Sequence, residues 1–397
     1  MIHPVDYLSS HGRSDEVSRK VDLVRDWLER RGLPGVVLTT SGGVAWLSDG
    51  ITNPIERGSR ESPLWLVVTP NSLGAITTAV EFPRLRAEAG LDAIGFPLVD
   101  APWFDVDSFP RSAEDIAGRP RSDLAADGHP AFAVDVSDDL VALRLTLSPA
   151  ERERLAKLGV LVADALEQAL RRWQPGEDDV DVQGRIAETL ERAGAGAPVL
   201  FVGGDDRVER FRHPLAAGVP VRRIAMAVAV GERTGLHVAA TRFACAGALT
   251  SSFRRTYDAA LRVEEAVLAS CRPGKTYGDA ITAVGDAYAA EGQPDAWREH
   301  YQGGPIGYWQ REFEIAPLDR SSRWFGHPFE TGQAVAWNPS FAGGGKVEDT
   351  FLLDLDGLVC LTDTGSWPTV PADGHSRAGI LDIATGDGAP IERRHRS

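Results

Sequence analysis

A repeated pattern in the second half of the chain constrains its fold more than any other feature. In both copies a long helical segment ends in a Pro-Gly turn, and a second amphipathic segment follows and stops at a glycine. The turns are residues 173–176 and 271–274, and the stops are Gly194 and Gly292. Because these four features recur in the same order, we interpret the second half as a duplicated helix-pair unit. Such a duplication predicts a pseudo-symmetric domain with a ligand cleft between its halves.

The start of this domain is marked by the residues Ser148-Pro149-Ala150-Glu151. A Ser cap, a Pro at the first helical position and a Glu at the capping-box spacing predict a helix start, and the helix continues to about Trp173. We therefore predict two domains, residues 1–147 and 148–397.

The first domain alternates helical and extended patterns, which predicts an α/β fold with a mixed sheet. The predicted helices are residues 17–31 and 81–89, with one more short helix inside the loop-rich stretch 101–128. The predicted strands are residues 36–39, 64–69, 74–78 and 131–136.

Composition limits the partners and the compartment that we expect. The formal net charge of −15 disfavours nucleic acid and anionic membranes. Residues 1–20 have no apolar core of the signal-peptide kind, and no apolar run approaches the roughly 20 residues of a membrane span. The three cysteines have no metal-binding spacing and fit a reducing compartment. We expect a cytoplasmic protein.

Three segments of the second half resemble one known family. They are residues 211–214 (Phe-Arg-His-Pro) leading into 219–231, residues 303–307 (Gly-Gly-Pro-Ile-Gly), and residues 337–339 (Trp-Asn-Pro) with 347–350 (Val-Glu-Asp-Thr). In this order and spacing they are similar to the peptidase M24 superfamily, which includes methionine aminopeptidase, prolidase, aminopeptidase P and creatinase. The resemblance implies a creatinase/prolidase-like N-terminal domain, a pita-bread C-terminal domain and a homodimer.

The family's two metal ions are held by two Asp, one His and two Glu, and the resemblance places these ligands on residues that mostly cannot bind a metal. The five positions are Ala229, Ala239, Gly304, Asn338 and Glu348. One carboxylate does not hold two divalent cations, which need several carboxylate or imidazole ligands at once. We therefore predict no metal and no cofactor. Creatinase is the family's metal-free precedent.

His213 and Glu348 are the predicted catalytic residues. The pKa of histidine lets His213 exchange a proton near neutral pH, and the matching His of the family contacts substrate. A solvated turn beside Arg210 and Arg212 is the alternative for His213. Glu348 is expected to bind a polar group or to orient His213, the alternative being a structural pair with Lys346. Asp349 is expected to hold a backbone turn.

Six further residues are predicted to bind the substrate. Asn338 keeps hydrogen-bonding capacity at a lost ligand position. The resemblance places Arg311 where the family often has a second, substrate-facing His, and a guanidinium there could clamp a carboxylate with two hydrogen bonds. A surface pair of Arg311 with Glu312 is an equal alternative, and His237 could equally face away on its strand. The other three predicted residues are His300, Tyr301 and Arg60, which lies in an N-terminal loop.

The function predicted from these residues is metal-independent hydrolysis of a C–N bond, an amide or amidine, in a small polar metabolite, with His213 moving the proton. A binding protein that keeps the cleft without catalysis is one alternative. A non-hydrolytic lyase or cyclase on the same scaffold is another. The expected partners are a small-molecule substrate and a second copy of the chain.

Overall fold

The computed structural model describes residues 10–52, 55, 57–372 and 375–384. The chain divides into two compact units. One consists of Met1–Arg144 with Thr234–Leu236, and the other of Leu145–Arg233 with His237–Ser397.

The N-terminal unit is an α/β domain around a mixed six-stranded sheet, whose strand order is β4-β3-β2-β1-β5-β6. The pairs β1/β2 and β2/β3 are antiparallel, while β3/β4, β1/β5 and β5/β6 are parallel. The strands are β1 (Val36–Thr40), β2 (Glu61–Val68), β3 (Leu73–Thr78), β4 (Leu98–Ala101), β5 (Ala125–Ala126) and β6 (Val134–Asp135). The α-helices are α1 (Ser10–Arg31), α2 (Ser41–Leu47), α3 (Phe82–Glu88), α4 (Ser108–Ala117) and α5 (Ser137–Arg144).

One predicted strand of this unit is much shorter than expected. Residues 131–136 were predicted to be extended, but only Val134–Asp135 pairs with a neighbouring strand. The backbone N–H of Phe132 instead donates to the carbonyl of His129 at 3.2 Å, which closes a turn. That turn places the Phe132 ring in the apolar core beside Trp65. The apolar side chain at position 132 is therefore buried by a turn, not by a strand.

The C-terminal unit holds two four-stranded sheets, ordered β18-β11-β10-β8 and β12-β13-β14-β15. The pair β11/β18 is parallel, and the pairs β8/β10, β12/β13, β13/β14 and β14/β15 are antiparallel. The strands of the first are β8 (Gly196–Gly204), β10 (Ile224–Arg233), β11 (Leu236–Cys245) and β18 (Ile380–Asp382). Those of the second are β12 (Gly303–Pro305), β13 (Ala334–Trp337), β14 (Asp349–Asp354) and β15 (Gly357–Cys360). Shorter pairs are formed by β7 (Glu177–Asp178) with β9 (Pro220–Val221) and by β16 (Thr369–Ala372) with β17 (His375–Ala378).

The duplicated helix pair predicted from the sequence is present. The first copy is α6 (Pro149–Arg172) with α7 (Asp179–Arg192), and the second is α9 (Ser251–Ser270) with α10 (Tyr277–Ala290). The turn glycines Gly176 and Gly274 have φ values of +100° and +86°, a region that favours glycine. The same backbone geometry at equivalent positions supports a duplication of one structural unit.

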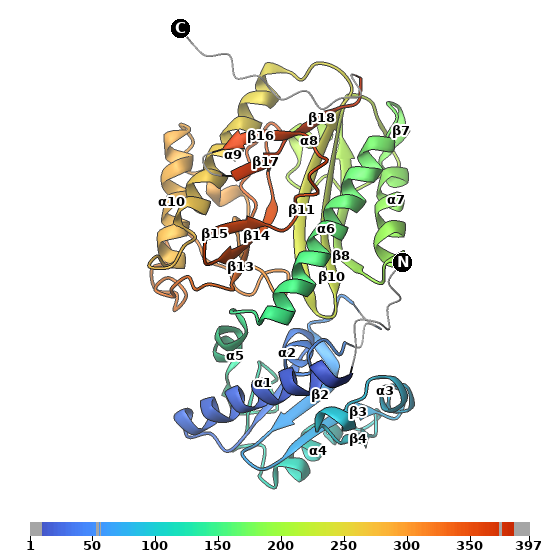
Figure 1. The fold of residues 1–397 in the computed structure, drawn as a ribbon, viewed down its shortest axis with the longest axis vertical. Coiled ribbons are helices and arrows are strands. Elements are labelled where there is room, and N and C mark those ends of the chain that lie inside the picture. The colour runs from blue at the N-terminus through green and yellow to red at the C-terminus, as the bar shows by residue number, and fades with distance from the viewer. Residues whose placement is uncertain (1–9, 53–54, 56, 373–374, 385–397) are drawn as a thin grey trace. The chain divides into compact units, whose positions relative to one another are not determined.

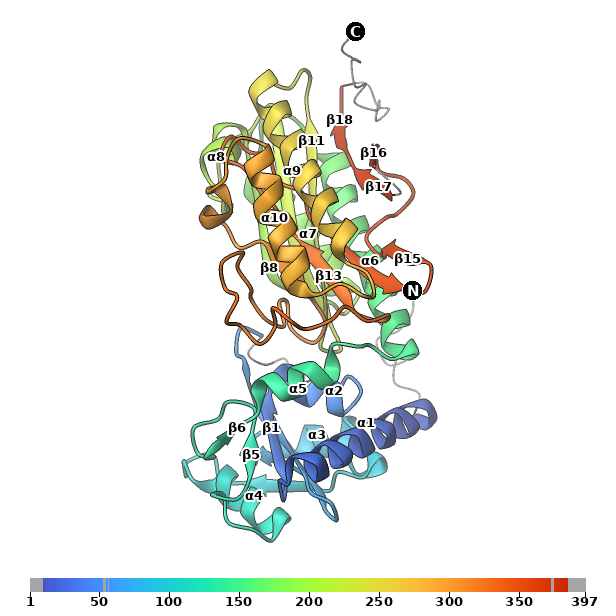
Figure 2. The same ribbon diagram turned by 90° about the vertical axis from the view of Figure 1, so that its left-hand side faces the viewer.

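The helix pairs cover the strands from outside. Figures 1 and 2 show α6 and α7 along one side of the C-terminal strands and α9 and α10 along the other. Helix α6 begins with the predicted capping box, in which Ser148 and Glu151 exchange side-chain-to-backbone hydrogen bonds. One more short helix, α8 (Asp205–Arg210), follows β8 and leads into the residues of the cavity described next. Within the described part of the chain, no helix has the length and apolarity needed to cross a membrane.

Candidate functional site

A cavity of about 590 Å³ lies in the C-terminal unit, and its two walls differ in chemistry. The strands β8 and β10 line one wall with apolar side chains. They are Val199, Phe201, Val228 and Val230. The polar side chains come from the ends of β13 and β14 and from two loops, and they are His213, Arg311, Glu314, Asn338, Lys346 and Glu348. The cavity therefore suits a ligand with one apolar side and several polar groups.

The orientation of β10 corrects one assignment made from the sequence. Val228 and Val230 line the cavity, and side chains alternate across a strand. Ala229 therefore faces the opposite side, so the lost ligand position had been placed on the wrong face. Neither valine carries a donor atom, so β10 contributes no metal ligand to this cavity. Ala239 of β11 does line the cavity, and it also carries no donor.

Glu348 immediately precedes β14 and is held by three contacts. Its Oε2 accepts a hydrogen bond from Thr241 Oγ1 at 2.8 Å, and its Oε1 accepts one from Asn338 Nδ2 at 3.1 Å. The Nζ atom of Lys346 lies 3.6 Å from Oε2. The pairing with Lys346 that the sequence left open is therefore present, and it lies in the cavity wall.

Lys346 is a site residue that the sequence reasoning missed, as is Glu314. Lys346 is 3% exposed, and burial lowers the pKa of its amine, while Glu348 acts in the opposite direction. The signal was available in the sequence, since residues two apart in an extended segment face the same side. A lysine two residues before Glu348 was thus placed to share its cavity.

His213 and His300 form a pair at the edge of the cavity. Their Nε2 atoms are 3.1 Å apart, a distance that requires one proton between them. Burial, followed by the charge of Lys346, lowers the pKa of His213, and Glu348 partly offsets this effect. Burial lowers the pKa of His300 to about 2, which keeps that ring neutral. His213 is therefore placed to accept a proton or a hydrogen bond from a cavity ligand.

Two more predicted binding residues line the cavity, and one does not. Arg311 forms an ion pair with Glu314, and its guanidinium lies 5.6 Å from the ring centre of Tyr301. Tyr301 is 68% exposed at the cavity rim. His237 is buried, and its backbone N–H donates to the carbonyl of Gly307 at 2.8 Å. His237 is not among the residues that line the cavity.

Arg60 lies in the N-terminal unit, just before β2, and its side chain is exposed. Its carbonyl accepts a hydrogen bond from the backbone N–H of Ser41 at 2.9 Å. Arg60 does not line the cavity of the C-terminal unit, and its predicted role in substrate binding stays a prediction.

The residues of the cavity do not fit a pair of metal ions. Its carboxylates are Glu314 and Glu348, and Glu314 is paired with Arg311. Both oxygens of Glu348 already take the contacts described above. Position 304, where the family has its histidine, has a φ of +144°, which an L side chain rarely adopts. Two divalent cations need more carboxylate or imidazole ligands than this cavity offers.

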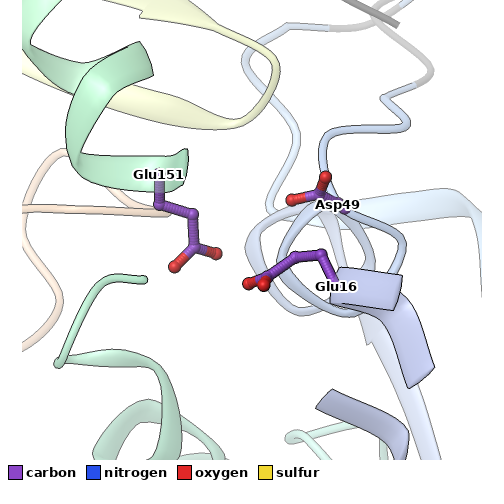
Figure 3. A group of neighbouring side chains, drawn as sticks. All are labelled: Glu16, Asp49 and Glu151. Carbon is purple, nitrogen blue, oxygen red and sulfur yellow. The ribbon is translucent and has the colours of Figure 1, made fainter. Parts of the chain in front are cut away.

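A separate group of carboxylates is drawn in Figure 3, and each has a partner within its own unit. Glu16 and Asp49 of the N-terminal unit pair with the buried amine of Lys20, at 3.4 and 3.2 Å. Glu151 of the C-terminal unit caps α6 and accepts a hydrogen bond from Tyr308 Oη at 2.5 Å. These contacts give all three carboxylates a structural explanation.

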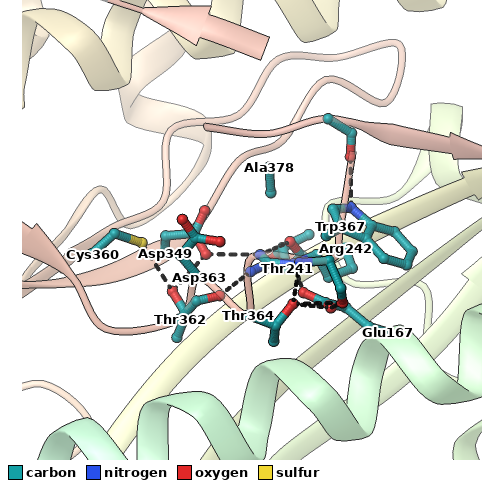
Figure 4. Close-up of polar contacts among 12 residues, drawn as sticks. Glu167, Thr241, Arg242, Asp349, Cys360, Thr362, Asp363, Thr364, Trp367 and Ala378 are labelled. Carbon is teal, nitrogen blue, oxygen red and sulfur yellow. Dashed lines mark hydrogen bonds and ion pairs between the residues drawn. The ribbon is translucent and has the colours of Figure 1, made fainter. Parts of the chain in front are cut away.

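A buried ion-pair network behind the cavity holds its polar strands in place (Figure 4). Arg242 of β11 is 2% exposed, and it contacts Glu167 of α6 at 3.3 Å and Asp349 of β14 at 2.7 Å. Burial opposes its charge, but the two carboxylates outweigh this and raise the pKa of Arg242. Asp349 also accepts from Thr362 Oγ1 at 2.6 Å, so it belongs to this network and does not hold a backbone turn as predicted. The network joins β11 to β14, and the backbone N–H of Thr241 donates to the carbonyl of Glu348 across that junction.

Comparison with known proteins identifies relatives of this fold. A model of metallopeptidase family M24 matches residues 153–354, just over half of the chain. Dipeptidase PepE from Mycobacterium ulcerans is 19% identical with a TM-score of 0.72, over 93% of this chain and 99% of that one. The Xaa-Pro dipeptidase from Bacillus anthracis is 17% identical with a TM-score of 0.70, over 92% of this chain and 100% of that one. The N-terminal domain of FACT complex subunit SPT16 from Cicer arietinum is 12% identical with a TM-score of 0.65, over 89% and 97%. No curated protein sequence matches this chain.

These findings confirm the predicted fold and overturn the predicted function. The α/β N-terminal domain followed by a pita-bread domain is the architecture of these structures. The prediction of a metal-independent hydrolase of a C–N bond in a small metabolite is wrong, because the matching family is one of metallopeptidases and its solved relatives include prolidases and Xaa-Pro dipeptidases. The error came from treating lost ligand positions as evidence for a different substrate and reaction, which they do not specify.

Proposed function

Because the chain belongs to metallopeptidase family M24, whose members hydrolyse peptide-like bonds, we propose that its cavity binds a short peptide. We further propose that it does so without a dinuclear metal centre of the family's kind. The ligand class is that named for the prolidases and Xaa-Pro dipeptidases of similar fold.

The observation that carries the proposal is the group of polar side chains formed by Lys346, Glu348 and Asn338 in the cavity wall. Lys346 supplies ammonium N–H donors on one side of Glu348, and Asn338 lies on the other side. The Oδ1 atom of Asn338 is buried and has no hydrogen-bond partner among the described residues. A peptide offers both complements, a carbonyl or carboxylate oxygen for Lys346 and an N–H for Asn338.

The remaining walls support the same ligand class. The valines of β8 and β10 form a surface for an apolar side chain or a proline ring, and such contacts favour binding in proportion to the area removed from water. His213, kept neutral by its lowered pKa, can accept or donate one hydrogen bond at the cavity edge. An unpaired buried acceptor such as Asn338 Oδ1 destabilises the empty site by about 1–3 kcal/mol, and a ligand N–H removes that penalty.

The test is calorimetric titration of the whole protein with Xaa-Pro dipeptides and with dipeptides that lack proline. We expect binding, and we expect Lys346→Met to weaken it about tenfold or more, because a hydrogen bond to a charged group contributes about 1.5–3 kcal/mol. Lys157→Met is the matched control, since Lys157 lies on the outside of α6 with a side chain 50% exposed. Its affinity should equal that of the unmodified protein.

The same samples test the metal part of the proposal. Added Mn²⁺, Co²⁺ or Zn²⁺ should leave peptide affinity unchanged, and chromatography should show no metal-dependent cleavage. Cleavage that requires an added metal would contradict the loss of the metal centre. The absence of binding across the whole panel would reject the peptide ligand itself.

A further inference from the structure

A second cavity of about 610 Å³ adjoins the first. The two share the wall residues His213, Tyr301 and Glu314. Beyond this wall, the second cavity is lined by polar and aromatic side chains, chiefly Arg212, Trp297, Glu299 and His300. Each cavity alone has the size, about 300–1,000 Å³, of sites that hold a whole small ligand. A dipeptide in the first cavity would leave the second one unfilled.

Arg212 gives the second cavity an unused donor. Its Nη2 atom donates to Glu299 Oε2 at 2.6 Å, and its side chain is 17% exposed. The Nη1 atom is buried and has no hydrogen-bond partner among the described residues. A guanidinium binds carboxylates through two parallel N–H groups, so a free Nη1 beside a bound Nη2 is suited to a second anionic group.

Two guanidinium groups line this cavity, those of Arg212 and Arg298, together with the carboxylates of Glu299, Glu314 and Asp319. Glu314 is engaged by Arg311, Glu299 by Arg212 and Arg298 by Asp295. Asp319 accepts a hydrogen bond from Ser321 Oγ at 3.1 Å. His300 adds no charge, because burial keeps it neutral, but its Nδ1 atom is buried and has no hydrogen-bond partner among the described residues. A ligand group between Arg212 and His300 therefore meets a guanidinium with one unpartnered nitrogen and a neutral imidazole.

We propose that the second cavity binds the C-terminal carboxylate of a peptide whose first residues fill the first cavity, so the preferred ligand is a tripeptide or longer. This inference rests on the proposed peptide ligand and adds its length and direction. Arg212 acts as a specificity-determining residue that recognises the carboxylate. Trp297 and Tyr301 supply apolar and aromatic surface for the intervening side chains.

The experiment compares an Xaa-Pro dipeptide with the same sequence extended by two residues at its C-terminus, as the free acid and as the amide. We expect the extended free acid to bind at least tenfold more tightly than the dipeptide, and amidation to remove most of that advantage. Arg212→Met should reduce the affinity ratio of extended peptide to dipeptide to about one, and Arg212→Lys should restore part of it.

Arg210→Met is the matched control, because Arg210 lies two residues away with a side chain 67% exposed and pairs with Asp206. It should keep the ratio of the unmodified protein, and thermal melts should show that all three variants are folded. A ratio near one for the unmodified protein, or an equal ratio in Arg212→Met, would overturn the inference while the peptide ligand stands. If no peptide binds at all, the proposed function fails, and this inference fails with it.

Discussion

Two buried charge clusters lie on opposite sides of the same junction between β11 and β14, and they differ in how completely they are paired. The cluster behind the cavity consists of Arg242, Glu167 and Asp349, and every buried polar atom of these side chains has a partner. The cluster in the cavity wall consists of Lys346, Glu348 and Asn338. Here the Oδ1 atom of Asn338 has no hydrogen-bond partner among the described residues.

The difference separates structural from ligand-binding roles. Burying ions requires several hydrogen bonds to offset lost hydration, and a fully paired cluster achieves this without any ligand. An incompletely paired cluster in a cavity keeps part of that penalty, which a bound ligand can relieve. We therefore assign the Arg242 network to stability and the Lys346 cluster to binding.

The largest expected effect is the loss of stability on breaking the Arg242 network. Arg242→Met leaves Glu167 and Asp349 as buried carboxylates without their cation, and such a change typically destabilises by about 3–5 kcal/mol. Urea unfolding of the whole protein, followed by circular dichroism, measures this loss of stability. Arg192→Met at a side chain 78% exposed is the control, expected to stay within about 0.5 kcal/mol of the unmodified protein. A loss as small as that of the control would show that the network is not structural.

Removing both charges of the cavity cluster, those of Lys346 and Glu348, should leave the free energy of unfolding nearly unchanged. Lys346→Met alone should destabilise by about 1–3 kcal/mol, less than Arg242→Met, because Glu348 loses its cation but keeps its hydrogen bonds from Thr241 and Asn338. Adding Glu348→Gln should return stability to within about 1 kcal/mol of the unmodified protein or above it, since both buried ions are gone. Thermal and urea melts of the two variants decide this. A double variant as unstable as Arg242→Met would place the cavity cluster among the structural ones.

A smaller effect concerns the pH dependence of stability. The folded-state pKa of His300, about 2, lies below the roughly 6.5 of an unfolded histidine. Below pH 6.5 the unfolded chain therefore binds a proton that the folded chain does not, and stability falls as pH decreases. His300→Gln removes this contribution, so its stability relative to the unmodified protein should improve by about 2 kcal/mol between pH 7 and pH 5. Parallel stability curves for the two proteins would contradict the buried, neutral state of this ring.

Local sequence patterns predicted the elements that depend on local chemistry. The capping residues Ser148 and Glu151 fixed the start of α6, and the turn glycines at 176 and 274 marked both helix pairs. Lost metal ligands could also be read from residue type, since Ala239 has no donor atom in any conformation.

The parts that the sequence did not predict depend on which residues meet across strands. Asp349 was expected to serve its own turn, yet its partner Arg242 lies more than a hundred positions away in the chain. Ala229 was placed on the cavity face because spacing alone does not show which side of β10 faces inward. The two-residue spacing of Lys346 and Glu348 indicated that they share one side of the chain, but the burial of the Lys346 amine is revealed only by the packed structure.

The last prediction is that added metal ions do not change the melting temperature. It tests most directly whether the cavity cluster of Lys346, Glu348 and Asn338 is free of metal. If Lys346 and Asn338 hold Glu348 as the structure shows, a divalent cation must displace both before it can bind that carboxylate. The ion would then be held by the carboxylate of Glu348, whereas such ions require several ligands at once. We expect Mn²⁺, Co²⁺, Zn²⁺ and EDTA to leave the melting temperature unchanged, and Co²⁺ to give no absorption band of a protein-bound ion. A stoichiometric Co²⁺ spectrum that disappears in Glu348→Gln would show that the ammonium yields its place to a metal, and the cavity cluster would then be a metal site held closed by Lys346.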